Sequence, residues 1–201
     1  MRSVITISRQ IGTEGDLIAK RVASLLEYQY FDKTILTAEA KRLGIHLGDP
    51  GSIDITENDY EPRGIIDSIL ANTGLISAAE DAQMKVSGTV ITELANKGNI
   101  VIVGRGGQAL LKGRSDVLHV KIIAPFEDRI DNLMLERFLN KSEAERLIKK
   151  SDKATKKFLE RLHNIDWEDI TYYDVIINVH KIPLDLAPTY IKGFAISPPG
   201  T

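Results

Sequence analysis

Residues 4–26 read VITISRQIGTEGDLIAKRVASLL. Residues 4–8 are rich in β-branched side chains, as in a strand, and residues 16–26 have the apolar spacing of an amphipathic helix. Between them, Gly12 and Gly15 allow the backbone to turn with its N–H groups pointing inward. The start of the helix adds the positive end of its dipole at the same place. This arrangement is typical of a phosphate-binding loop.

The side chains usual in such a loop are missing. The strict pattern, G-x-x-x-x-G-K-[ST], is matched only at Gly15. Gln10 replaces the first glycine, Asp16 replaces the lysine and Leu17 replaces the hydroxyl residue. Glycines between a strand and a helix also occur as ordinary turn residues. The backbone pattern alone therefore predicts an anion site at residues 12–17.

The composition indicates a single domain without polyanionic partners. A chain of 201 residues with 43% hydrophobic content is long enough for one α/β domain with a small insertion. Lysine and arginine total 26 against 28 for aspartate and glutamate, so no global field favours a nucleic acid polymer or an anionic membrane. Cysteine is absent, which excludes disulfides and agrees with an intracellular setting. No stretch is typical of a signal peptide or a membrane span, so we expect a soluble, cytoplasmic protein.

The periodicity predicts alternating strands and helices. Strands are predicted at residues 4–8, 28–31, 100–103, 117–123 and 173–179. Helices are predicted at residues 16–26, 34–43, 65–72, 76–95, 142–162 and 184–191. A further long helix is predicted to begin at Pro125. This order predicts a three-layer α/β/α fold with a five-stranded parallel sheet and right-handed crossovers.

Unusual residues follow three of the predicted strands. Gly12 and Gly15, then Asp32, then Gly104 with Arg105, each lie just past the carboxyl end of a strand. Ligands of parallel α/β sheets bind at that edge. We therefore expect these residues to belong to one site.

Several stretches share a pattern with a known family: residues 5–12 (ITISRQIG), 30–33 (YFDK), 103–106 (VGRG), 124–129 (APFEDR) and 148–153 (IKKSDK), and Trp167 with Tyr173 and Asp174. On these stretches the chain resembles the cytidylate kinase-like family, a branch of the P-loop nucleoside monophosphate kinases. The resemblance implies one P-loop kinase-type domain at residues 1–195, with its core at 1–43 and 83–195. It also implies a helical acceptor-binding insertion at about 44–82, a lid at about 137–165 and a flexible tail at 196–201.

The resemblance also implies an activity and a set of site residues. The reaction would move the γ-phosphoryl group of ATP to CMP or a similar small phosphorylated acceptor, with Mg²⁺ bridging the donor phosphates. The implied cofactor-binding residues are Gly12, Thr13, Glu14, Gly15, Asp16 and Leu17. The implied acceptor-binding residues are Asp32, Lys33, Gly104 and Arg105. The implied catalytic residues are Arg105 on the acceptor phosphate, Arg129 on the donor side, and Asp152 and Lys153 in the lid.

Three departures from the family pattern keep a second interpretation open. Relatives usually have a glycine where this chain has Glu14, a basic residue where it has Asp16, and Asp-Lys-x-Arg where it has Asp152-Lys153-Ala154-Thr155. Carboxylates at a phosphate site repel the ligand. A nucleotide-binding protein of the same fold with impaired catalysis is therefore the alternative. A dinucleotide-binding oxidoreductase is disfavoured, because the glycine spacing does not fit that fingerprint.

Ordinary structural roles also remain open. Asp32 fits a helix N-cap, Arg129 fits a salt bridge on its helix, and the lysine-rich residues 146–157 fit a solvated helix face. The sequence leaves the oligomeric state undetermined, with a homodimer as one alternative. The four histidines do not have the spacing of metal ligands, so we expect no protein metal site; they are His46, His119, His163 and His180.

Overall fold

The structure is a computed structural model that describes residues 1–32, 35, 88 and 90–197 of the chain. The strands are β1 (Val4–Arg9), β2 (Gln29–Phe31), β3 (Ile100–Val103), β4 (Val117–Ile123) and β5 (Val175–Asn178). The helices are α1 (Gly15–Leu26), α5 (Gly107–Leu110), α6 (Phe126–Arg137), α7 (Lys141–His163) and α8 (Ala187–Ile196), with a 3₁₀ turn, η2 (Ile170–Tyr172). Residues 90–97 are also helical.

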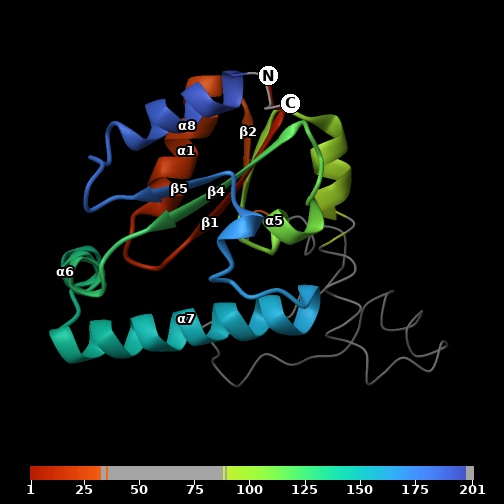
Figure 1. Cartoon of the computed structure of the whole chain (residues 1–201). Helices are drawn as coiled ribbons and strands as arrows, with labels where there is room; N and C mark the ends of the chain where they lie inside the picture. Colours follow the sequence, from red (N-terminus) through yellow and green to blue (C-terminus); the bar gives the residue numbers. More distant parts are fainter. Residues whose placement is uncertain (33–34, 36–87, 89, 198–201) are drawn as a thin grey trace.

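The strands form one parallel sheet in the order β2-β3-β1-β4-β5, which confirms the predicted α/β fold with a five-stranded parallel sheet. β1 lies in the centre, with Val4 opposite Ile100 of β3 and Val117 of β4. Parallel neighbours require a crossover between them, and these crossovers place helices on both faces of the sheet. Figure 1 shows this layered arrangement.

α1 and α8 cover one face of the sheet (Figure 1). Side chains alternate along a strand, so Ile5 and Ile7 of β1 both point to this face, where Ile18 and Val22 of α1 and Ile191 of α8 join the same cluster. All of these side chains are at most 1% exposed. This packing fixes α1, and with it the glycine turn that precedes it, against the centre of the sheet.

The second face carries apolar packing at its amino-terminal end. Val4 of β1 and Ile102 of β3 belong to one buried cluster on this face, together with Ile91 from residues 90–97 and Leu111 after α5. α1 therefore leaves β1 toward one face, and α5 leaves β3 toward the other. Between neighbouring parallel strands, this divergence opens a crevice at the carboxyl ends.

A buried polar row continues the second face toward those carboxyl ends. Thr6 Oγ1 lies 2.7 Å from His119 Nδ1, and Trp167 Nε1 donates to Ser8 Oγ at 2.8 Å. Lys121 Nζ donates to the Trp167 carbonyl oxygen at 2.7 Å. Buried polar groups need such partners because their desolvation is otherwise costly. Trp167 therefore closes this face and fixes Ser8 at the end of β1.

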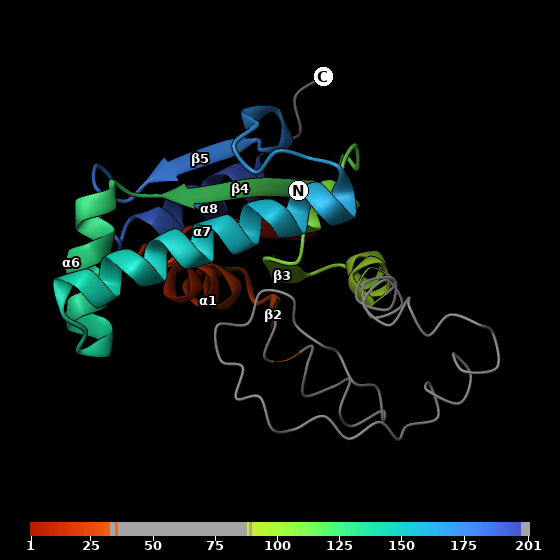
Figure 2. The ribbon, with the colours of Figure 1, turned by 90° about the horizontal axis from the view of Figure 1, so that it is seen from below.

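α7 is the longest described helix, with 23 residues. A capping box starts it, because Asn140 Oδ1 accepts from the Glu143 N–H and the Glu143 carboxylate accepts from the Asn140 N–H. Ile130 and Leu133 of α6 pack against Ala144 and Ile148 of α7. Figures 1 and 2 show α7 as a long, straight helix that begins near the end of α6 and lies beside the sheet.

The main differences between the observed and the predicted elements concern β5, the last helix and α5. β5 is shorter than residues 173–179, because η2 ends at Tyr172 and the Asp174 carboxylate accepts from the His119 N–H instead of extending the strand pattern. The last helix lies at Ala187–Ile196, later than the predicted 184–191, so residue 196 belongs to it and not to the tail. α5 was not predicted, since four residues that begin with glycine carry no periodic signal.

Several predictions lie outside the described residues. They are the helices at 34–43 and 65–72, most of 76–95, the insertion at 44–82, residues 198–201 of the tail, and Lys33. Among the helices that are described, none has both the length and the apolar character that crossing a bilayer requires.

Candidate active site

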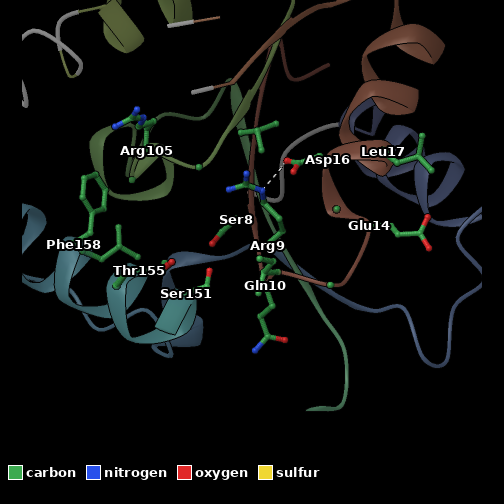
Figure 3. A pocket seen from close by; sticks show the side chains of 18 of the residues that line it. Ser8, Arg9, Gln10, Glu14, Asp16, Leu17, Arg105, Ser151, Thr155 and Phe158 are labelled. Carbon is green, nitrogen blue, oxygen red and sulfur yellow. Dashed lines mark hydrogen bonds and ion pairs between the residues drawn. The ribbon is translucent and has the colours of Figure 1, made fainter. Parts of the chain in front are cut away.

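A cavity of about 520 Å³ lies at the carboxyl ends of β1 and β3 (Figure 3). This volume is in the usual range for a small-molecule site, and the position is the crevice between α1 and α5. The loop after β1, the turn after β3 and one face of α7 form most of its wall, and the end of α6 and Gln108 of α5 complete it. The lining residues are 8–12, 14–17, 103–106, Gln108, Glu136, Arg137, Ser151, Ala154, Thr155, Phe158 and Leu159.

The loop after β1 presents backbone donors at the start of α1. Gly12 has φ +81°, and a Cβ atom there would lie 2.6 Å from the Arg129 carbonyl oxygen, so the position requires glycine. In the described part of the chain, the N–H groups of residues 12–17 make no backbone hydrogen bond, and Ile18 is the first to donate, to Glu14 O at 3.1 Å. These N–H groups and the helix dipole can bind an anion.

Arg129 holds this loop against α6 and α7. Its Nε donates to Ile11 O at 2.8 Å, and its two terminal nitrogens donate to Asp152 of α7 at 2.9 and 2.7 Å. Asn132 Nδ2 adds a bond to Gly12 O at 2.9 Å. The predicted catalytic residues Arg129 and Asp152 therefore contact each other, and neither lines the cavity.

The turn after β3 has an unusual backbone. Gly104, Arg105 and Gly106 have φ values of +72°, +58° and +71° in succession. The Gly104 N–H donates to Ile7 O at 2.9 Å, and a Cβ atom at Gly106 would lie 2.3 Å from Nε2 of His163, at the end of α7. An arginine in the left-handed region costs free energy, so the surrounding structure must hold it in this conformation. The turn places Arg105 on the cavity wall, across from Asp16 (Figure 3).

The acidic residues of the loop do not both face the cavity. The Asp16 carboxylate accepts from Arg9 Nε at 2.8 Å, so a cation partly balances its charge. The Glu14 side chain points away from Arg9 and Arg105 (Figure 3). Sequence reasoning missed this pairing of Asp16, because the glycine turn separates the two partners along the chain.

One face of α7 completes the cavity. Ser151, Ala154, Thr155 and Phe158 follow the spacing i, i+3, i+4 and i+7 of a single helix face. Lys153 is exposed and does not line the cavity. The predicted lid residues thus separate into a cavity face without lysines and a solvated face with them. The polar residues of the cavity face were missed, although their spacing was a usable signal.

The comparison with known families agrees with this geometry. The model of the cytidylate kinase-like family matches residues 4–181, from β1 through β5. The chain belongs to the cytidylate kinase-like family. It is similar to a cytidylate kinase from Methanocaldococcus jannaschii, with 31% identity over 91 residues. That match covers 44% of this chain and 51% of the kinase, so the chain matches about half the length of this relative.

Solved structures show the same fold as this family member. An uncharacterized protein from Eubacterium ventriosum has a TM-score of 0.70 at 22% identity, covering 97% of this chain and 98% of that one. A shikimate kinase from Bacteroides thetaiotaomicron has a TM-score of 0.55 at 13% identity, covering 96% and 98%. A shikimate kinase from Acinetobacter baumannii in complex with shikimate has a TM-score of 0.52 at 15% identity, covering 96% and 93%. At these identities the likeness concerns the P-loop kinase fold alone.

Two residues that the family resemblance placed in the site have local roles in the structure. Asp32 accepts from the Ile35 N–H at 2.9 Å and from the Tyr30 hydroxyl at 3.0 Å, and it does not line the cavity. Burial, with this hydrogen bond to Asp32, raises the pKa of Tyr30. Thr13 is fully buried, and its hydroxyl donates to Gln10 O at 2.7 Å.

The donor set of this family member does not suggest a chelated metal. In the described residues there is no group of three or more His, Asp or Glu side chains that could hold an ion. Leu17 supplies no oxygen ligand, and the Asp16 carboxylate is paired with Arg9.

Proposed function

We propose that this chain is an ATP-dependent phosphotransferase that acts on CMP or a similar small phosphorylated acceptor. The observation that carries the proposal is that one cavity is lined both by Gly12 and residues 14–17, whose N–H groups make no backbone hydrogen bond in the described part of the chain, and by the Arg105 turn. A phosphoryl transferase needs two phosphate-binding elements that face a common space. Family membership and the similarity to a cytidylate kinase support this assignment.

Each wall of the cavity would have its own task. The donor phosphates bind the N–H groups of residues 12–17, where the dipole of α1 adds positive potential. The acceptor phosphate binds Arg105, whose planar guanidinium can donate two parallel bonds to phosphate oxygens. α7 covers the cavity with Ser151, Thr155 and Phe158, which limits water around the phosphates. Rate enhancement then arises from positioning and charge neutralisation, with no covalent enzyme intermediate.

A coupled kinase assay over CMP, UMP, AMP and GMP tests the activity, with calorimetry for each ligand. Arg105→Ala is expected to weaken binding of the accepted monophosphate by about tenfold or more, because a charged hydrogen bond is worth about 1.5–3 kcal/mol. Binding of ATP should change much less. Arg114→Ala is the control, since Arg114 pairs with Asp116 and does not line the cavity. Equal weakening of both ligands would remove Arg105 from the acceptor site.

A second candidate function is nucleotide binding without efficient turnover. It is favoured by the carboxylates of Glu14 and Asp16 at the loop and by Thr155 at a cavity position where relatives commonly have arginine. Loss of an arginine that stabilises the transition state costs about a thousandfold or more in rate. Binding of ATP and a monophosphate by calorimetry, with no ADP formed in the kinase assay, would favour this candidate.

A further inference from the structure

The Arg9 side chain crosses the floor of the cavity between its two phosphate-binding walls. Its aliphatic part lies on Gly15, where an added Cβ atom would be 2.6 Å from Arg9 Cβ and 2.7 Å from Cγ. Its Nη1 lies 3.0 Å from the position that a Cβ atom would take at Gly104. Figure 3 shows the guanidinium between the first turn of α1 and the turn that carries Arg105. Both glycines thus leave room for Arg9.

The guanidinium keeps most of its hydrogen-bonding capacity for the cavity. Arginine has five N–H donors. In the described part of the chain, the Arg9 side chain makes one hydrogen bond, from Nε to Asp16 Oδ1 at 2.8 Å. The Nη1 and Nη2 donors are therefore not used by this pair. Arg9 is 32% exposed and lines the cavity, so these donors are accessible to a ligand.

We propose that Arg9 is a phosphate-binding residue of this site and that Asp16 is its positioning residue. Arg9 supplies, from the end of β1, the cation that the loop lacks where Asp16 replaces the basic residue. Its place between residues 12–17 and the Arg105 turn suits a phosphate group at the boundary of the donor and acceptor positions. This inference rests on the proposed function, because it assigns a role in the same cavity.

A purely structural role for the pair is the competing explanation. Exposed ion pairs contribute little to stability. The Arg114–Asp116 pair has the same N–O distance, 2.8 Å, but lies outside the cavity. The exposed fraction is 29% for the Arg114 side chain and 32% for the Arg9 side chain, and it is 41% for Asp116 and 56% for Asp16. Arg114→Gln is therefore a control for the loss of an ion pair outside the cavity, and a demanding one, since Arg114 also donates to Asn96 Oδ1 and Ala95 O.

The test measures binding of tripolyphosphate and of ATP by calorimetry to the wild-type chain, Arg9→Gln, Arg9→Lys, Asp16→Asn and Arg114→Gln. Arg9→Gln should weaken both ligands at least tenfold, whereas Arg114→Gln should leave both unchanged. Arg9→Lys should recover part of the affinity, because it keeps the charge but not the planar fork. Asp16→Asn keeps an oxygen for Nε and removes a negative charge, so its affinity should equal or exceed that of the wild type. Melting temperatures show whether each variant is folded.

The outcomes separate this inference from the proposed function. If the wild type binds ATP and a folded Arg9→Gln variant binds it equally well, the role of Arg9 is overturned and the proposed function is not. Binding of tripolyphosphate but not ATP, lost in Arg9→Gln, supports Arg9 and overturns the nucleotide assignment. Binding of neither ligand to the wild type overturns both. A loss of affinity in Arg9→Gln that Arg114→Gln reproduces also overturns the role of Arg9.

Discussion

Arg129 of α6 and Asp152 of α7 form a two-pronged ion pair, with N–O distances of 2.9 and 2.7 Å. The third nitrogen of the same guanidinium donates to Ile11 O at 2.8 Å. Arg129 is 3% exposed, so this contact is almost fully withdrawn from water. One side chain thus fixes the loop after β1 relative to α6 and α7. A role in positioning the loop fits this geometry better than a direct contact with the donor nucleotide.

We predict that Asp152→Asn destabilises the protein by about 2–3 kcal/mol, because it leaves a buried guanidinium without its counter-charge. The figure lies below the range for fully buried pairs, since the Asp152 side chain is 25% exposed. Urea denaturation followed by circular dichroism measures the change. Glu145→Gln is the control, because Glu145 makes only a surface contact with Lys149 at 3.7 Å. An equal loss of stability in the two variants would show that the Arg129–Asp152 pair contributes no more to stability than a surface ion pair.

Glu14 offers a test of strain in the loop. It precedes α1 with φ +54°, a conformation that costs an L-residue about 1–2 kcal/mol and glycine almost nothing. After allowance for the greater chain entropy of glycine, we predict that Glu14→Gly raises the free energy of unfolding by about 0.5–1 kcal/mol. Glu14→Gln removes the same charge but keeps the strain, so it should leave stability nearly unchanged. If both variants gain equally, charge and not backbone strain is the cause.

The sequence predicted the sheet well because local patterns define its strands. Residues 100–103 are a continuous apolar run that ends at a glycine, and residues 117–123 are mostly apolar and β-branched, with His119 and Lys121 among them. Both strands were predicted with their observed limits. The glycine turn after residues 4–8 likewise placed α1 and the loop. These features are contained in short windows, where periodicity and turn residues suffice.

The contacts that organise the cavity could not be predicted in the same way. Trp167 bonds to Ser8 across 159 positions of sequence, and Arg129 reaches Ile11 across 118. The pairing of Arg9 with Asp16 depends on how tightly the backbone turns at Gly12 and Gly15. Such contacts depend on tertiary packing, which leaves no periodic signal in one sequence.

Thr155 allows a gain-of-function test. It lines the cavity, at the position where the family pattern given above implies an arginine. We predict that Thr155→Arg tightens ATP binding by about 1.5 kcal/mol, or about tenfold in Kd, through a charged hydrogen bond to phosphate. If the remaining groups are competent, phosphoryl transfer rises as well. Calorimetry and the coupled assay measure the two effects.

The control for Thr155→Arg is Glu160→Gln. It changes the net charge by the same amount at an exposed position of α7 that does not line the cavity. An equal gain in both variants would indicate a general electrostatic effect. No gain in Thr155→Arg would indicate that α7 does not approach the bound phosphates.

The final prediction concerns pH and the contact between His163 and the Arg105 turn. Burial lowers the pKa of His163, whose ring lies where a Cβ atom of Gly106 would be. The unfolded chain then binds a proton at about pH 6.5 that the folded chain binds only at lower pH. The free energy of unfolding therefore has its full value above about pH 6.5 and decreases as the pH falls toward the pKa of His163 in the folded state. Protonation should loosen the end of α7 from the turn.

We predict that His163→Gln reduces the loss of stability between pH 7.5 and 5.0, measured as the change in the urea midpoint. Some pH dependence will remain, because burial also lowers the pKa of His119. His180→Gln is the control, since His180 is an exposed residue that contacts Asp128 at the surface. In wild type, acidification should also weaken monophosphate binding at Arg105 more than in His163→Gln. Identical pH profiles for the wild type and His163→Gln would show that this histidine does not couple protonation to the turn.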